Sequence, residues 1–267
     1  MTQEQQPKNP ADSDRYERER AFHDARFTED DRPSNRFYEQ VHESSMGFVR
    51  EAIDSLAPDA KVLEFGCGPK AEAAIRAASG GRQAVAFDLS PVAIEEARAD
   101  ASARGFGDRI DFHVMNAEEV QLPAAQFDAV FGAGILHHLD LRQAYGQIAR
   151  LLRADGRAVF VEPMGHNAII NLYRQRTPGD RTSDEHPLLV EDLALGREYF
   201  EDVQPNYFGL ASLLTLPVER MRKSAALVQR LDTLDRLLFH RVPAIGRYAW
   251  LVALDLQRPR SRNDEAR

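Results

Sequence analysis

The stretch VLEFGCGPK, residues 62–70, decides how this chain of 267 residues folds. It begins as an apolar run with one acid and then turns at two glycines, Gly66 and Gly68. Asp88 ends a second apolar run a short distance further along the chain. A strand, a glycine turn, a helix and a second strand that ends in an acid are typical of a nucleotide-binding half-sheet. Which nucleotide the turn holds therefore decides the predicted function.

Short apolar segments alternate with amphipathic segments on both sides of this motif. Ser90 and Pro91 have the types expected at the N-cap and the first position of a helix. The pattern predicts further strands at 110–114, 127–131, 157–161, 202–208 and 248–256, helices over 141–152 and much of 210–238, and two N-terminal helical stretches. Such alternation predicts an α/β fold of Rossmann-like type, with a doubly wound, mostly parallel, seven-stranded sheet.

The alternation of short strands and amphipathic helices ends after Glu162, and we divide the chain at this point. A C-terminal helical elaboration that covers the substrate is expected after the core. The predicted divisions are a disordered lead-in at 1–15, an N-terminal helical cover at 16–57, a nucleotide-binding core at 58–163, a substrate-binding insertion or lid with the closing strands at 164–257, and a flexible tail at 258–267.

Composition narrows the class of protein. The chain has 34 basic and 42 acidic residues, a net charge of −8, which argues against nucleic acid as a partner. Cys67 is the only cysteine, so no intrachain disulfide can form. We find no signal peptide and no apolar run long enough to span a membrane, so we expect a cytoplasmic protein with no membrane span. The sequence is compatible with a monomer or with a homodimer.

Two nucleotides fit the glycine turn. Gly66-x-Gly68-x-x-Ala71 matches the dinucleotide fingerprint, and Asp88 would then bind the ribose of NAD. Other features favour S-adenosylmethionine (SAM). Glu64 places an acid before the first glycine, where it suits a cationic amino acid moiety. Asn116-Ala117-Glu118, after the third predicted strand, suits the amino edge of adenine. The segment at 126–139, which holds the fourth predicted strand and the residues after it, comes next along the chain.

With these motifs in this order, the sequence resembles the class I SAM-dependent methyltransferases, in their small-molecule type 11 branch, over about residues 15–161. The segment at 22–24 also resembles the N-terminal cover of this branch. The resemblance implies SAM as the cofactor and implies cofactor-binding roles for Glu64, Gly66, Gly68, Asp88, Leu89, Asn116, Ala117, Gly132 and Ala133. Where the family usually has a third glycine, this chain has Lys70, which could bind the carboxylate of the cofactor but crowds the turn.

Candidate catalytic groups gather after the fourth and fifth predicted strands, at the edge where open α/β sheets bind ligands. His137, Glu162 and His166 are the candidate acid and base groups, because histidine and carboxylate can move protons near neutral pH. The candidate substrate-binding residues are His138, Asn167, Asn171, Tyr173 and Arg174. The Asp184-Glu185-His186-Pro187 motif lacks the spacing of a metal site, so no metal is predicted.

The predicted function is methyl transfer from SAM to a small-molecule acceptor in secondary or specialised metabolism, with O-methylation favoured over N- or C-methylation. One alternative is an NAD(P)-dependent oxidoreductase, which the glycine turn alone would also fit. Another is a SAM-binding protein that acts as a scaffold or cyclase without methylating.

Overall fold

The computed structural model describes residues 15–21, 24, 35–177, 185–215 and 225–260. The predicted lead-in up to residue 14 and the tail from residue 261 lie outside these ranges, as do Phe22, His23 and Asp184. The first described segment, 15–21, is helical. No helix among the described residues is long and apolar enough to cross a membrane.

One seven-stranded sheet organises the fold, in the order β3-β2-β1-β4-β5-β7-β6. β1 to β5 are parallel, and β7 lies between β5 and β6, antiparallel to both. The strands are β1 (Lys61–Phe65), β2 (Gln83–Asp88), β3 (Ile110–Val114), β4 (Phe127–Ala133), β5 (Leu152–Pro163), β6 (Phe200–Phe208) and β7 (Leu251–Pro259). The predicted doubly wound, mostly parallel sheet is confirmed.

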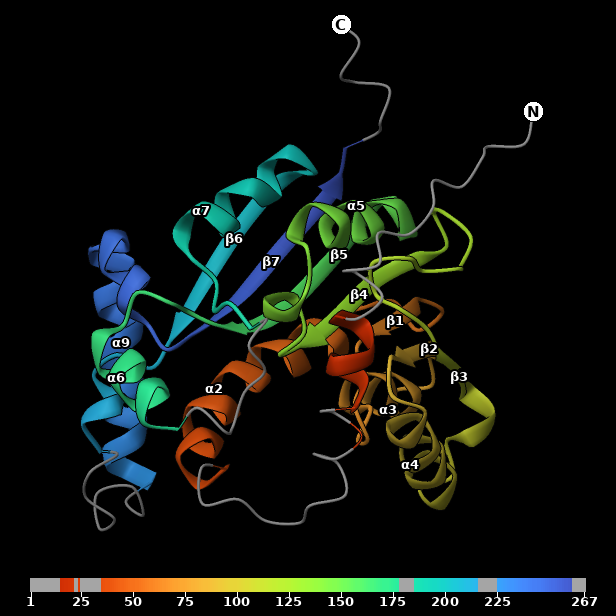
Figure 1. Ribbon diagram of the computed structural model, residues 1–267, viewed down its shortest axis with the longest axis horizontal. Helices are drawn as coiled ribbons and strands as arrows, with labels where there is room; N and C mark the ends of the chain where they lie inside the picture. The colour runs from red at the N-terminus through yellow and green to blue at the C-terminus, as the bar shows by residue number, and fades with distance from the viewer. Residues whose placement is uncertain (1–14, 22–23, 25–34, 178–184, 216–224, 261–267) are drawn as a thin grey trace, which may run out of the picture.

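Helices cover both faces of the sheet (Figure 1). On one face α2 (Asn35–Asp54), α3 (Glu72–Ser79) and α4 (Pro91–Ala103) bury side chains in one apolar cluster. On the other face α5 (Leu141–Leu151) and α7 (Val190–Leu195) contribute to a second cluster. Two apolar layers that enclose one sheet are the core of an α/β domain.

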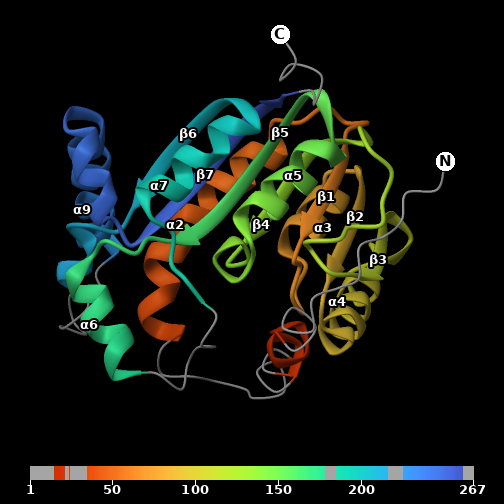
Figure 2. The same cartoon turned by 45° about the horizontal axis from the view of Figure 1, so that its top comes forward.

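The remaining helical elements lie after the parallel strands. α6 (Ala168–Arg176) and α9 (Ala225–Arg241) gather at the same end of the molecule in both views (Figures 1 and 2). The 3₁₀ turns are η1 (Gly107–Arg109), η2 (Leu136–His138), η4 (Gly196–Glu198), η5 (Ser212–Thr215) and η6 (Pro243–Tyr248).

Two strands differ most from the sequence prediction in their bounds. β5 begins at Leu152 rather than Arg157, because Leu152 pairs with Phe127 and a register shift absorbs the residues between them. The residues between the predicted helix at 141–152 and the predicted strand at 157–161 are therefore part of the strand. β7 runs to Pro259, because β6 pairs with it as far as Phe200, so the start of the predicted tail belongs to the sheet.

Candidate active site

The glycine turn after β1 is built on left-handed backbone. Gly66, Gly68 and Ala71 have φ of 72°, 55° and 41°. The amides of Gly66 and Cys67 donate to the carbonyl of Phe87, which ties the turn to β2. A Cβ at Gly66 would clash with Ile135, whereas one at Gly68 would meet only open space. Gly68 therefore exposes backbone on an open side of the turn, as a close-fitting ligand requires.

Asp88 connects the end of β2 to this turn. One carboxylate oxygen accepts from the amide of Gly68 at 2.9 Å, and the other accepts from the amide of Ser90 at 2.9 Å. Ser90 is the N-cap of α4, since its hydroxyl accepts from the amide of Ala93. The predicted N-cap is confirmed, and Asp88 stays at the carboxyl edge beside half-exposed Leu89.

Glu64 has a structural role that the sequence did not suggest. Its carboxylate accepts hydrogen bonds from the amides of Ala73 (3.2 Å) and Ala74 (2.8 Å), in the first turn of α3. Ala71, the N-cap residue of α3, has no capping side chain, so Glu64 satisfies these amides from the neighbouring strand. Burial raises the pKa of Glu64 to about 8 despite these two bonds.

Lys70 does not strain the turn. Its side chain is exposed, and the left-handed conformation falls on Ala71, the next residue. The crowding expected from a lysine at this position is therefore absent. Cys67 is buried, and burial raises the pKa of its thiol, so it is a packing residue rather than a nucleophile.

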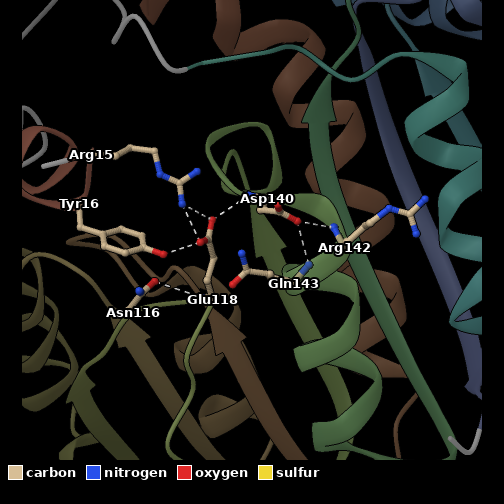
Figure 3. Close-up of polar contacts among 7 residues, drawn as sticks. All are labelled: Arg15, Tyr16, Asn116, Glu118, Asp140, Arg142 and Gln143. Carbon is tan, nitrogen blue, oxygen red and sulfur yellow. Dashed lines mark hydrogen bonds and ion pairs between the residues drawn. The ribbon is translucent and has the colours of Figure 1, made fainter. Parts of the chain in front are cut away.

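The helical segment 15–21 is fastened over the end of β3 (Figure 3). Arg15 donates to both carboxylate oxygens of Glu118, at 2.7 and 2.6 Å, and the Tyr16 hydroxyl donates to the same carboxylate at 2.5 Å. Glu118, whose side chain is fully buried, also accepts from the amide of Asp140. Four hydrogen bonds from three residues thus converge on one carboxylate and join the N-terminal segment to the sheet edge.

Asn116 and Ala117 lie beside this cluster. The Asn116 side-chain oxygen accepts from the amide of Glu118 at 3.0 Å, which makes an Asx turn after β3. Ala117 is buried. Asn116 is therefore a turn former in this structure, and contact with adenine stays a prediction.

Gly132 and Ala133 end β4 at the same edge. A Cβ at Gly132 would clash with the ring of Phe160 and the carbonyl of Phe65, so only glycine fits between these strands. Ala133 is exposed at the carboxyl edge. Gly132 is required by the packing of the sheet, and Ala133 is free to meet a ligand.

Glu162 organises the turn that follows β4. Its side chain is completely buried, and one oxygen accepts from the amides of Ile135 and Leu136, both at 2.9 Å. The other oxygen lies 2.7 Å from Nδ1 of His137. This contact favours the tautomer with hydrogen on Nδ1, which leaves the electron pair of His137 on Nε2.

His138 is held in a similar way. Its Nδ1 lies 3.2 Å from an oxygen of Glu19, which comes from the N-terminal segment, and its Nε2 lies 3.9 Å from Glu185. The rings of His137 and His138 are 4.2 Å apart between centroids. Burial lowers the pKa of His138, so this imidazole is neutral at neutral pH.

Most polar side chains after β5 form hydrogen bonds with the protein's own backbone. His166 Nε2 accepts from the amide of Val190, and Asn167 is the N-cap of α6. The side chains of Asn171 and Arg174 donate to the carbonyls of Gly165 and Met164, at 2.6 and 3.0 Å. Half-exposed Tyr173 lies on the same helix. Substrate contacts by these residues stay predictions.

Comparison with known proteins bears on this geometry. Residues 63–160 match the family described as "Methyltransferase domain". The chain is 31% identical over 120 residues to a probable tocopherol O-methyltransferase of rice, covering 45% of this chain and 33% of the relative. It is 36% identical over 107 residues to aklanonic acid methyltransferase of a Streptomyces species, covering 39% of this chain and 48% of the relative. The alignments thus span a third to a half of these relatives.

The fold has a solved counterpart. The geranyl diphosphate C-methyltransferase of Streptomyces coelicolor, solved with Mg²⁺, geranyl diphosphate and S-adenosylhomocysteine, superposes with a TM-score of 0.61. It is 14% identical and covers 94% of this chain and 100% of that chain. Residues 63–160 thus match a methyltransferase domain, and the chain as a whole shares the fold of a solved methyltransferase. The family predicted from the sequence is confirmed.

Some residues at the edge of the methyltransferase domain were missed by sequence reasoning. Arg15, Tyr16 and Glu19 come from the N-terminal segment, where charged residues are so frequent that no pattern separates them. Glu118 adjoins the predicted Asn116-Ala117 pair, and Glu185 belongs to a motif already noted for its density of ionisable groups. The sequence around Glu118 and Glu185 therefore contained a pattern from which both residues could have been predicted.

Proposed function

We propose that this protein transfers the methyl group of SAM to a hydroxyl oxygen of a small-molecule acceptor. The observation that carries the proposal is the arrangement at the carboxyl edge of β1 and β2, where an open glycine turn lies between two acids, Glu64 and Asp88. Ligands of open α/β sheets bind at this edge, where the strand order reverses.

Each part of the cofactor has a chemical counterpart at this edge. Asp88 suits the ribose hydroxyls, and Leu89 suits the face of the adenine. The buried carboxylate of Glu64, at the start of the glycine turn, suits the ammonium group of the methionine part. Exposed Lys70 suits its carboxylate. Gly66, Gly68, Gly132 and Ala133 supply close backbone approach, and Asn116 with Ala117 completes the adenine side.

The reaction is an in-line displacement. The acceptor oxygen attacks the methyl carbon, the sulfur–carbon bond breaks, and S-adenosylhomocysteine leaves with the electron pair. The hydroxyl proton passes to a base. His137 is the proposed base, because Glu162 fixes its Nδ1 and leaves the Nε2 electron pair for this proton. Glu162 is fully buried, so under this proposal it positions His137 rather than touching the acceptor.

Oxygen as the acceptor atom has two kinds of support. An unactivated hydroxyl needs a base, and the His137–Glu162 pair provides one. Two relatives are also named for O-methylation, the tocopherol enzyme and 27-O-demethylrifamycin SV methyltransferase of Amycolatopsis mediterranei, which is 35% identical over 99 residues. Another relative, geranyl diphosphate 2-C-methyltransferase of Saccharopolyspora erythraea, is named for methylation at carbon, so the acceptor must be tested directly.

Cofactor identity is tested by thermal unfolding of the purified protein with S-adenosylhomocysteine or with NAD. We expect a higher melting temperature with S-adenosylhomocysteine only, because a ligand that binds the folded state alone stabilises it. Protection by NAD but not by S-adenosylhomocysteine would replace this proposal with the oxidoreductase. Profiling small molecules that take up label from methyl-labelled SAM then identifies the acceptor and its methylated atom.

The role of His137 is tested with Glu162→Gln once an acceptor is known. We expect kcat to fall while the affinity for S-adenosylhomocysteine is kept, and the pH profile of kcat to shift because the imidazole has lost its carboxylate. A variant with unchanged kcat and pH profile would remove this pair from the reaction.

A further inference from the structure

Three ionisable side chains from two distant parts of the chain meet beside the proposed cofactor site. His137 and His138 lie on η2, and Glu185 comes from the segment that leads into α7. One candidate ligand atom from each lies within 4.8 Å of the others. The sequence predicted no metal here because the 184–187 motif was judged without the histidine pair that the fold brings to it.

The backbone holds Glu185 in this place. The amide of His186 donates to the carbonyl of His137 at 2.9 Å, so the chain beside Glu185 is bonded to η2 itself. Two residues later, the amide of Leu188 donates to the carbonyl of Pro163 and its carbonyl accepts from Gly165. Main-chain pairing at His186 and Leu188 therefore holds Glu185 next to the two histidines.

Each of the two imidazole rings has a second carboxylate beside its Nδ1 atom, as metal-binding histidines commonly do. Nδ1 of His137 faces Glu162 and Nδ1 of His138 faces Glu19. Histidine ligands of metals usually donate one ring N–H to a carboxylate or carbonyl and bind the ion through the other nitrogen. With Nδ1 of each ring turned toward a carboxylate, Nε2 is the nitrogen that would bind the ion, and Nε2 of His138 lies 3.9 Å from Glu185.

The spacing and the charge suit a cation. Zinc ligands lie about 2.0–2.2 Å from the ion, so two of them are about 3.4 Å apart in a tetrahedral site. A separation of 3.9 Å exceeds a hydrogen bond and closes to that value by a small rotation. The side chains of Glu19, Glu162 and Glu185 are 7%, 0% and 8% exposed. Carboxylates therefore lie beside both imidazole rings, and a bound cation would interact favourably with them.

We propose that His137, His138 and Glu185 bind one divalent transition-metal ion of the zinc type, with a position left open for the acceptor oxygen. Two histidines and one carboxylate with an open position are a ligand set of catalytic zinc sites, and imidazole favours zinc over magnesium. Binding of the ion does not depend on the proposed function. The action of the ion on the acceptor does rest on that function. With the ion bound, His137 would be a ligand rather than the base, and the ion would lower the pKa of the acceptor hydroxyl in its place.

The test is zinc binding by tag-free protein that has been stripped with a chelator. Titration calorimetry with ZnSO₄ and metal analysis after gel filtration give affinity and stoichiometry, and Co²⁺ substitution gives a visible absorption band. His138→Ala and Glu185→Gln each remove one proposed ligand. His186→Ala is the matched control, because its exposed side chain adjoins Glu185 and its backbone bond to His137 is kept.

We expect one zinc ion per chain in the wild type and in His186→Ala. Glu185→Gln and His138→Ala should bind at least about tenfold more weakly, with loss of the Co²⁺ band. Wild-type protein that retains no zinc, or Glu185→Gln that binds as well as the wild type, would overturn the proposal. Thermal protection by S-adenosylhomocysteine is measured on every variant. It shows that each variant is folded, and its absence in the wild type would count against the proposed function alone.

Discussion

The Glu64 carboxylate accepts hydrogen bonds from backbone amides in the first turn of α3, and burial raises its pKa. Its protonation should therefore affect the pH dependence of folding stability. The unfolded chain loses this proton near pH 4.5 and the folded chain near 8. Between these values the folded state binds more protons, so the free energy of unfolding falls as pH rises through this window. At about 1.4 kcal/mol per pH unit the loss is at most about 5 kcal/mol.

Glu64→Gln has no such proton, so its stability should decline less than that of the wild type between pH 5 and pH 8.5. Urea unfolding of both proteins without ligand at several pH values measures the difference. Parallel curves would show that Glu64 is ionised in the folded protein throughout. The same residue should make S-adenosylhomocysteine bind more tightly as pH rises from 6 to 7.5, because an ammonium group favours the carboxylate.

Ala71 and Lys70 separate strain from charge in the glycine turn. Ala71 is fully buried at φ 41°, where a β-branched side chain is strongly disfavoured. We expect Ala71→Val to lower the free energy of unfolding by about 2–3 kcal/mol. Lys70→Ala should change it by less than about 0.5 kcal/mol, because Lys70 is exposed.

Cofactor affinity then reports the role of the Lys70 charge. If the ammonium group meets the cofactor carboxylate, Lys70→Ala binds S-adenosylhomocysteine several-fold more weakly at unchanged stability. Equal affinity of the variant and the wild type would show that the backbone of the turn holds the carboxylate alone.

At the scale of elements, the cluster around Glu118 joins the helical segment 15–21 to the sheet edge. We call this segment the strap and propose that it retains the bound cofactor. Arg15→Gln and Tyr16→Phe each remove bonds from a buried carboxylate. Arg15 is partly exposed, so we expect a modest effect, about tenfold faster dissociation of S-adenosylhomocysteine, or about 1.4 kcal/mol. Stopped-flow displacement measures the rate, with Glu17→Gln on the exposed side of the same segment as the control.

An off-rate that matches the Glu17→Gln control would show that the strap does not retain the cofactor. Faster hydrogen exchange in residues 15–21 of Arg15→Gln, with no change elsewhere, would show that the fastening itself is local.

Elements were predictable where their signals are local. The strand at 110–114 has the predicted bounds, and Ser90-Pro91 begins α4, because alternation and capping are written in neighbouring residues. The start of β5 was mistaken because its first residues pair with Phe127 across a register shift, which only the partner strand dictates. Long-range contacts escaped for the same reason. Nothing near Glu185 in the sequence indicates that it meets His138.

At the scale of the whole molecule, the C-terminal strands lie in the same sheet as the nucleotide-binding core. β7 pairs with β5 along seven registered positions, from Arg157↔Gln257 to Pro163↔Leu251. Leu254 and Leu256 of β7 complete one apolar cluster and Ala253 the other. We therefore propose that the divisions at 58–163 and 164–257 are functional ones within a single cooperative domain.

The only tryptophan, Trp250, tests this proposal because it is buried just before β7. Its fluorescence reports the C-terminal part, whereas far-ultraviolet circular dichroism reports every helix and strand. We expect the two urea unfolding curves to coincide, as they do for one cooperative unit. Curves with separate midpoints would show that the C-terminal strands unfold by themselves.

Asp255→Asn sharpens the test, because Asp255 on β7 is 4% exposed and forms a two-point ion pair with Arg157 on β5, at 2.8 and 2.9 Å. Removing one partner of a buried pair leaves the other uncompensated, and we expect a loss of about 2–3 kcal/mol. In a single unit, the fluorescence and dichroism midpoints shift together by the same amount. Glu201→Gln, which removes an exposed partner of Arg258 on the neighbouring strand pair, should shift neither by more than about 0.5 kcal/mol. If Asp255→Asn moved only the fluorescence curve, β7 would be an addition to a core that folds without it.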